Sequence, residues 1–144
     1  MKFPRIICID FDGVLHPTAE GAQRVTVAHF SWLPHLERLL SPHPGVGLPV
    51  HSTWRLSYDI EELRLLLGDR LGPRVVSAAP ASDDRWAAIQ AWVGAQKLAP
   101  DLLIVDDARA EFPDLLPFPL VVCYASRGLS DTLVQQAIRN WLER

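Results

Sequence analysis

Two aspartates separated by one residue, Asp10 and Asp12, follow the apolar run 6–9 and precede Gly13. Side chains alternate along a strand, so carboxylates two residues apart start on the same side of it. Two acids this close repel unless a cation lies between them, and Mg²⁺ is a hard cation that prefers oxygen ligands. The glycine allows a sharp turn after the strand. The pattern therefore predicts either a magnesium site at a strand end or a simple tight turn capped by Asp10.

Polar residues also end two later strand candidates. Ser52 and Thr53 end one of them, and Asp106 and Asp107 end the fully apolar run 102–105. Ligands of parallel α/β sheets bind beyond the carboxyl ends of the strands. We therefore expect these residues to meet the first aspartate pair at one edge of a sheet.

Strand and helix patterns alternate along the chain, and the strands are apolar throughout rather than at every second residue. This pattern indicates a parallel sheet covered by helices on both faces. We predict an α/β fold, with residues 1–144 forming a single doubly wound domain around a mostly parallel five-stranded sheet. The expected strands are 6–9, 46–51 (weakened by Pro49), 74–78, 102–105 and 120–124. One helix is expected over residues 57–67, and the others are expected to follow the caps Ser31, Ser82 or Asp83, and Ser130 or Asp131. Residues 25–27 are expected to be extended.

The composition is that of an ordinary globular protein. The chain has 144 residues, of which 49% are hydrophobic and 22% charged, and its net charge is −3. This length suits one core, the composition excludes a disordered chain, and the charge does not require a nucleic-acid partner. No apolar run reaches membrane-spanning length, so we expect a cytoplasmic protein without a membrane partner. Cys8 and Cys123 are interpreted as small buried hydrophobic residues.

The acids at the strand ends suit phosphoryl transfer. The Asp10 carboxylate would attack phosphorus to form an aspartyl-phosphate, which water then hydrolyses. Asp12 would protonate the leaving oxygen and later accept a proton from that water. Mg²⁺ held by Asp10, the Asp12 carbonyl and an acid at Asp106 or Asp107 would offset the negative charge of nucleophile and substrate.

Neutral and cationic groups would bind the phosphate of the substrate. A hydroxyl of Ser52 or Thr53 would contact one phosphate oxygen, and Arg85 or Lys97 would contact another. Gly13 is expected at the substrate side of the same turn. Arg55 is interpreted either as a ligand of a second phosphate or as a surface arginine.

The sequence resembles the haloacid dehalogenase superfamily of phosphatases and phosphotransferases. Its first motif is an apolar strand followed by Asp-x-Asp-Gly, and it corresponds to residues 9–15. The second motif, a Ser or Thr after the next strand, fits Ser52 best. Arg85 fits the third motif, a cation near a helix start, because Lys97 lies at the far end of that helix. The fourth motif is the pair 106–107, and the resemblance favours Asp107 as the direct metal ligand.

The resemblance also implies the strand order 5-4-1-2-3, with the two cysteines on non-adjacent strands. Neither usual insertion point leaves room for a cap domain, and an open site suits a large substrate such as a nucleic-acid end or a phosphoprotein. The residues around 52–55 and 106–107 are similar to capless domains linked to RNA repair systems. His16 and His51 are interpreted as solvent-facing or supporting residues, and Trp54 as a core residue rather than a base-stacking one. The alternatives are a receiver-like phosphoacceptor and a catalytically idle binding module.

Overall fold

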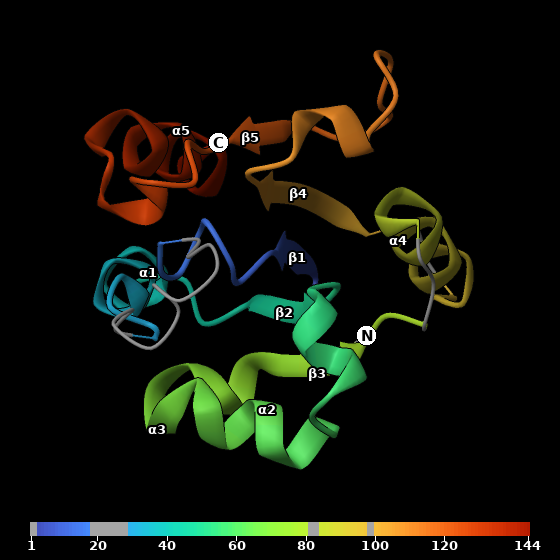
Figure 1. Ribbon diagram of the computed structural model, residues 1–144, viewed down its shortest axis with the longest axis horizontal. Coiled ribbons are helices and arrows are strands. Elements are labelled where there is room, and N and C mark those ends of the chain that lie inside the picture. Colours follow the sequence, from blue (N-terminus) through green and yellow to red (C-terminus); the bar gives the residue numbers. More distant parts are fainter. Residues whose placement is uncertain (1–2, 18–28, 81–83, 98–99) are drawn as a thin grey trace, which may run out of the picture.

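This computed structural model describes residues 3–17, 29–80, 84–97 and 100–144. Those residues form one parallel five-stranded sheet in the order β3-β2-β1-β4-β5, with β1 at its centre (Figure 1). The predicted α/β class and strand order are confirmed. The strands are β1 Arg5–Ile9, β2 Val46–Val50, β3 Val75–Ala78, β4 Asp101–Asp106 and β5 Leu120–Val122.

The central strands are apolar throughout because both of their faces are covered. In β1, Ile7 and Ile9 belong to one buried cluster, whereas Ile6 and Cys8 belong to a second cluster. The first cluster gathers side chains of the helices α1, α2, α3 and α5, and the second gathers those of α4. Burial of aliphatic side chains on both faces is the dominant stabilisation of such a layered domain.

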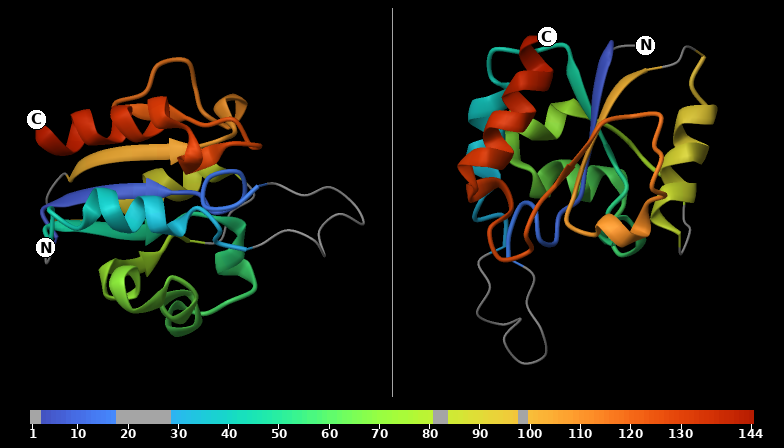
Figure 2. Two further views of the ribbon diagram at one scale, coloured as in Figure 1. Left: turned by 90° about the vertical axis from the view of Figure 1, so that its left-hand side faces the viewer. Right: turned by 90° about the horizontal axis from the view of Figure 1, so that it is seen from above.

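The helices form the two outer layers. Helices α1 and α5 lie on one side of the sheet and α4 lies on the other (Figures 1 and 2). Their bounds are α1 Leu33–Leu40, α2 Ile60–Leu66, α3 Gly68–Leu71, α4 Arg85–Gly94 and α5 Thr132–Glu143, and short 3₁₀ turns are η2 Thr53–Leu56, η3 Gly72–Arg74, η4 Arg109–Glu111 and η5 Gly128–Ser130.

The helix starts differ from the sequence prediction in three places. Helix α1 is capped by Trp32 rather than Ser31, without a side-chain hydrogen bond, and α2 begins at Ile60 after an Asp59 capping box. The proposed caps Ser82 and Asp83, like the extended piece 25–27, lie outside the described residues. Helix α4 is capped instead by Asp84, whose side chain accepts a hydrogen bond from Ala87 N. The alternative cap Asp131 is present at α5.

Two sequence features are accommodated as expected. Pro49 lies within β2, at the point where the register of β2 with β3 shifts between Leu48 and Val50. Such an irregularity tolerates a residue that lacks an amide hydrogen.

Cys8 and Cys123 are buried free thiols, on strand β1 and just after β5. In the described parts of the chain, no helix combines the length and apolarity needed to cross a bilayer.

Gly128 begins the 3₁₀ turn η5, which precedes α5, and it lies against the loop that follows β1. Its φ is +46°, and an added Cβ would overlap the ring of Trp32 and lie 2.5 Å from the Val14 carbonyl oxygen. The next residue, Leu129, donates its N–H to that same oxygen at 3.0 Å. This close backbone contact holds the loop that carries Asp12 against the α1–α5 layer.

We expect Gly128→Ala to lower the free energy of unfolding by about 1–3 kcal/mol, because the methyl group would be overpacked and the backbone strained. The matched control is Gly94→Ala at the end of α4, where an added Cβ has no neighbour within 4 Å. That variant should be unchanged or up to about 1 kcal/mol more stable. Urea unfolding of both measures the difference, and equal stability of the two variants would contradict the packing argument.

Candidate active site at the carboxyl ends of the strands

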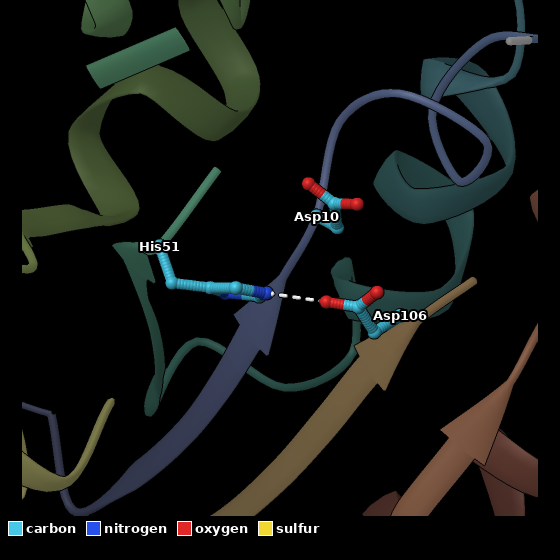
Figure 3. A group of neighbouring side chains, drawn as sticks. All are labelled: Asp10, His51 and Asp106. Carbon is cyan, nitrogen blue, oxygen red and sulfur yellow. Dashed lines mark hydrogen bonds and ion pairs between the residues drawn. The ribbon is translucent and has the colours of Figure 1, made fainter. Parts of the chain in front are cut away.

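Strand register brings Asp10, His51 and Asp106 together. Ile9 pairs with Val50 of β2 and with Val105 of β4, and the three polar residues are the next ones along these strands. His51 points toward Asp106, with Asp10 next to this pair (Figure 3), and potential ligand atoms of the three lie within 4.8 Å of each other. Parallel pairing in this register therefore places two carboxyl groups and an imidazole at one point of the sheet edge.

Asp106 is the most completely satisfied acid of the site. Its side chain is 1% exposed, and Oδ2 lies 2.8 Å from His51 Nε2. Oδ1 accepts hydrogen bonds from Arg85 Nη1 at 2.6 Å and from Ala108 N at 2.9 Å. Burial alone would raise the pKa of Asp106, but its His51, Arg85 and Ala108 partners lower it below the usual value. Asp106 is thus a buried anion with both oxygens occupied.

Arg85 supplies the positive charge of the site. It is the first residue of α4, and its Nη1 lies 3.3 Å from Asp10, 2.6 Å from Asp106 and 3.8 Å from Asp107. The Asp84 cap fixes the helix start from which this side chain extends. Lys97 is exposed and lies beyond the other end of α4. Of the two cations expected from the sequence, the structure brings Arg85 to the acids and leaves Lys97 away from them.

Asp10 and Asp107 are within hydrogen-bonding reach of each other through their carboxyl groups. Two carboxyl groups this close repel each other when both are ionised. Burial, followed by the charge of Asp106, raises the pKa of Asp10 well above its usual value, and burial also raises that of Asp107. Asp10 and Asp107 are therefore the acids of the site whose ionisation the surroundings disfavour, even with Arg85 beside them.

Asp12 has different partners from Asp10. Its Oδ1 lies 2.6 Å from His16 Nε2 and accepts a hydrogen bond from Trp54 Nε1 at 3.1 Å. Because the backbone N–H of Phe30 donates to His16 Nδ1, the proton of this imidazole is on Nε2 and is donated to Asp12. The His16 hydrogen bond is the main cause that lowers the pKa of Asp12. The second oxygen of this half-exposed carboxylate receives neither donor.

The residues that the sequence predicts to contact phosphate differ from one another in burial and in hydrogen-bond partners. Ser52 is fully buried and its Oγ accepts from Trp54 N at 3.2 Å, whereas Thr53 is exposed. Arg55 donates to the backbone carbonyls of residues 51, 52, 79 and 80, so it joins the loops after β2 and β3. Gly13 has a φ of +79° and donates its N–H to the His16 carbonyl at 2.8 Å, which closes the turn after β1.

Two histidines support the acids more directly than the sequence indicated. His16 and His51 are 1% and 2% exposed, so neither faces solvent, and each is hydrogen bonded to one aspartate of the site. His51 Nδ1 is buried without a partner among the described residues. One sequence feature could have indicated that His51 belongs to the site. It follows the last apolar residue of its strand, as Asp10 and Asp106 follow those of their strands.

The donor set fits a hard divalent cation. Burial and neighbouring acids raise the pKa of Asp10, and burial raises that of Asp107, and a cation between their oxygens would relieve this excess of negative charge. Asp106 is less suited to direct coordination because its oxygens already accept from His51, Arg85 and Ala108. The backbone carbonyl of Asp12, two residues from Asp10, offers a further oxygen of the kind that Mg²⁺ binds.

Comparison with protein-family models gives a match over residues 6–134 to the family described as "HAD domain in Swiss Army Knife RNA repair proteins". This span contains the acids, the histidines and the arginines described above. Neither the curated proteins nor the solved structures include a match to this chain.

We expect Arg85→Met to lower the free energy of unfolding by about 3 kcal/mol at pH 7, because it leaves buried carboxylates without their counter-charge. The loss should be smaller at pH 5. Arg85 lowers the pKa of Asp10, so its removal would raise that already raised pKa further. A group with a raised pKa in the folded state binds a proton there first, so the stability of the variant should rise as the pH falls.

Urea unfolding at the two pH values measures this effect. Arg85→Lys keeps the charge and should recover part of the stability. Arg70→Met on α3, where the side chain is exposed, is the matched control and should change stability by less than about 0.5 kcal/mol. Equal losses for Arg85→Met and Arg70→Met would contradict the role given to Arg85.

Proposed function

The chain belongs to the family of HAD domains in Swiss Army Knife RNA repair proteins, a branch of a hydrolase superfamily, and on this premise we propose that it is a Mg²⁺-dependent phosphomonoester hydrolase. Its substrate would be a phosphate on a nucleic-acid end or a nucleotide, and an aspartyl-phosphate would be the intermediate. The observation that carries the proposal is the buried Asp10 carboxyl group, in contact with Arg85 and Asp107 at the sheet edge. This is the position where an attacking acid meets both a fixed cation and a further acid.

Asp10 is proposed as the nucleophile. One of its oxygens would form a bond to phosphorus while the bond from phosphorus to the leaving oxygen breaks, which gives an aspartyl-phosphate and a free hydroxyl. Water would then attack the same phosphorus and release inorganic phosphate with the regenerated carboxylate. Arg85 faces Asp10 and would stabilise the charge that builds on the phosphoryl oxygens.

Asp12 is proposed as the acid and base. Its lowered pKa makes it an anion before substrate arrives, and a dianionic phosphate beside it would raise that pKa and favour the protonated form. The proton would pass to the leaving oxygen in the first step and return from the attacking water in the second. His16 and Trp54 fix one oxygen of the carboxylate, so the other is presented to the substrate.

Mg²⁺ is proposed to bind Asp10, the Asp12 carbonyl and Asp107, with Asp106 positioning Arg85 and His51. When bound it would neutralise charge between the nucleophile and the phosphate. We retain Ser52 as the hydroxyl proposed to contact the phosphate, and we propose that Arg55 holds the loops after β2 and β3. Between Asp12 and Arg85 the described residues form only helices, turns and strands of the main layers, which is consistent with a one-domain, capless protein and a large substrate.

Asp10→Asn should abolish Mg²⁺-dependent release of phosphate from a phosphorylated oligonucleotide while the free energy of unfolding does not fall. The amide keeps the acceptor for the Phe11 N–H but cannot form the acyl phosphate, and it removes an ionisation that burial disfavours. Phosphate release, acid-quench trapping of labelled protein and urea unfolding provide the measurements, with EDTA-treated protein as the metal control. Turnover in Asp10→Asn comparable to that of the unaltered protein would exclude the covalent route.

His16→Ala should lower kcat by about 10- to 100-fold with a smaller change in KM, because the reactive oxygen of Asp12 would lose its orientation. Combining it with Asp12→Asn should give no further loss beyond Asp12→Asn alone. His43→Ala, which lies before β2 at the opposite sheet edge, is the matched control and should keep kcat. Additive losses in the double variant would mean that His16 acts independently of Asp12.

A further inference from the structure

A column of aromatic rings leads from the core to the surface beside Asp12. Phe11 is fully buried and meets Trp54 edge-on, with ring centres 5.9 Å apart. Tyr58 stacks on Trp54 at 5.5 Å with an angle of 21° between the planes, and it is 37% exposed. The column therefore ends in a nearly parallel pair whose outer member reaches solvent.

The column is attached to the proposed catalytic acid. Trp54 packs against the core and also donates its indole N–H to Asp12, so the ring is fixed at both ends. Asp12 is the group proposed to protonate the leaving oxygen. Whatever is bonded to that oxygen extends to the Asp12 side of the site, which is the side of Trp54 and Tyr58.

Tyr58 offers an exposed ring next to a candidate active site. Its chain neighbours Ser57 and Asp59 are exposed and polar, so the ring itself, rather than an apolar patch, is the surface that a ligand would contact. Leu56, at the end of η2, is 56% exposed. Aromatic faces of this kind bind nucleobases with little preference among them, because every base has a π face.

We propose that Tyr58 is a nucleobase platform, on which the base of the nucleotide bearing the scissile phosphate stacks as the outermost ring of the column. This inference rests on the proposed function, because it takes Asp12 to be the residue that meets the leaving oxygen. It makes the substrate a nucleotide or a nucleic-acid end rather than a sugar phosphate or a phosphopeptide. It also predicts tolerance of base identity.

The test compares kcat/KM for a phosphorylated dinucleotide with kcat/KM for glycerol 2-phosphate, which has no ring to stack. In Tyr58→Ala the ratio of the two should fall by about 5- to 150-fold, mainly through the KM of the dinucleotide, which corresponds to the loss of one stacked base. Tyr58→Phe keeps the ring and should keep the ratio within about twofold. Tyr124→Ala is the matched control, since that tyrosine is 72% exposed after β5, and it should leave the ratio unchanged.

A second measurement does not depend on turnover. In the Asp10→Asn background, fluorescence anisotropy gives the Kd of a labelled phosphorylated oligonucleotide, and Tyr58→Ala should raise this Kd by a similar factor. If no phosphomonoester is hydrolysed but the Kd still depends on Tyr58, the hydrolase proposal fails and the platform stands. The platform is overturned if Tyr58→Ala changes neither ratio nor Kd, or if KM for a phosphoserine peptide depends on Tyr58 and that for the dinucleotide does not.

Discussion

The site depends on how much negative charge the centre of the sheet can hold where its strands end. Parallel pairing places Asp10 beside Asp106, with Asp107 next in the chain. Burial raises the pKa of Asp10 and of Asp107, whereas the hydrogen-bond partners of Asp106 keep that residue an anion. Arg85, at the start of α4, supplies positive charge to these acids. His51, directly after β2, contributes a hydrogen bond to Asp106 rather than a charge, because burial lowers its pKa. The features that suit the site to a cation and to a phosphate are the same ones that make it electrostatically costly without them.

The fold could be predicted because its main signal is local. Apolar runs such as 102–105 need cover on both faces, and alternation with helices then requires parallel pairing. Helix starts were less well predicted, since several Ser and Asp residues compete for each cap and the tertiary position of the turn decides among them. Asp84 caps α4 where Ser82 or Asp83 had been expected, and Asp59 caps α2, so this helix begins later than the expected start at Ser57.

The candidate site was only partly predictable, because its key contacts depend on register and side-chain direction. No local sequence pattern specifies the register in which Val50 pairs with Ile9, so the contact between His51 and Asp106 could not be predicted. Similarly, Arg55 and Arg85 are equivalent as isolated cations, yet backbone carbonyls surround the first and carboxylates surround the second. The alternation argument for Asp10 and Asp12 applies only within a strand. Because β1 ends at Ile9, the turn at Gly13 gives Asp12 its own partners, His16 and Trp54.

This separation of the two aspartates gives the site two chemically distinct sides. Asp10 lies in a buried, highly charged environment that suits a phosphate and a metal ion, and its neighbours there are acids and Arg85. Asp12 lies in a half-exposed aromatic environment, where two N–H donors fix one oxygen and the rings beyond them are uncharged. A phosphomonoester has the same division, with an anionic group at one end and an organic leaving group at the other. Under the proposed function, this distribution of charge and aromatic surface would orient a phosphomonoester before any step of chemistry, with the leaving group directed along the column that ends at Tyr58.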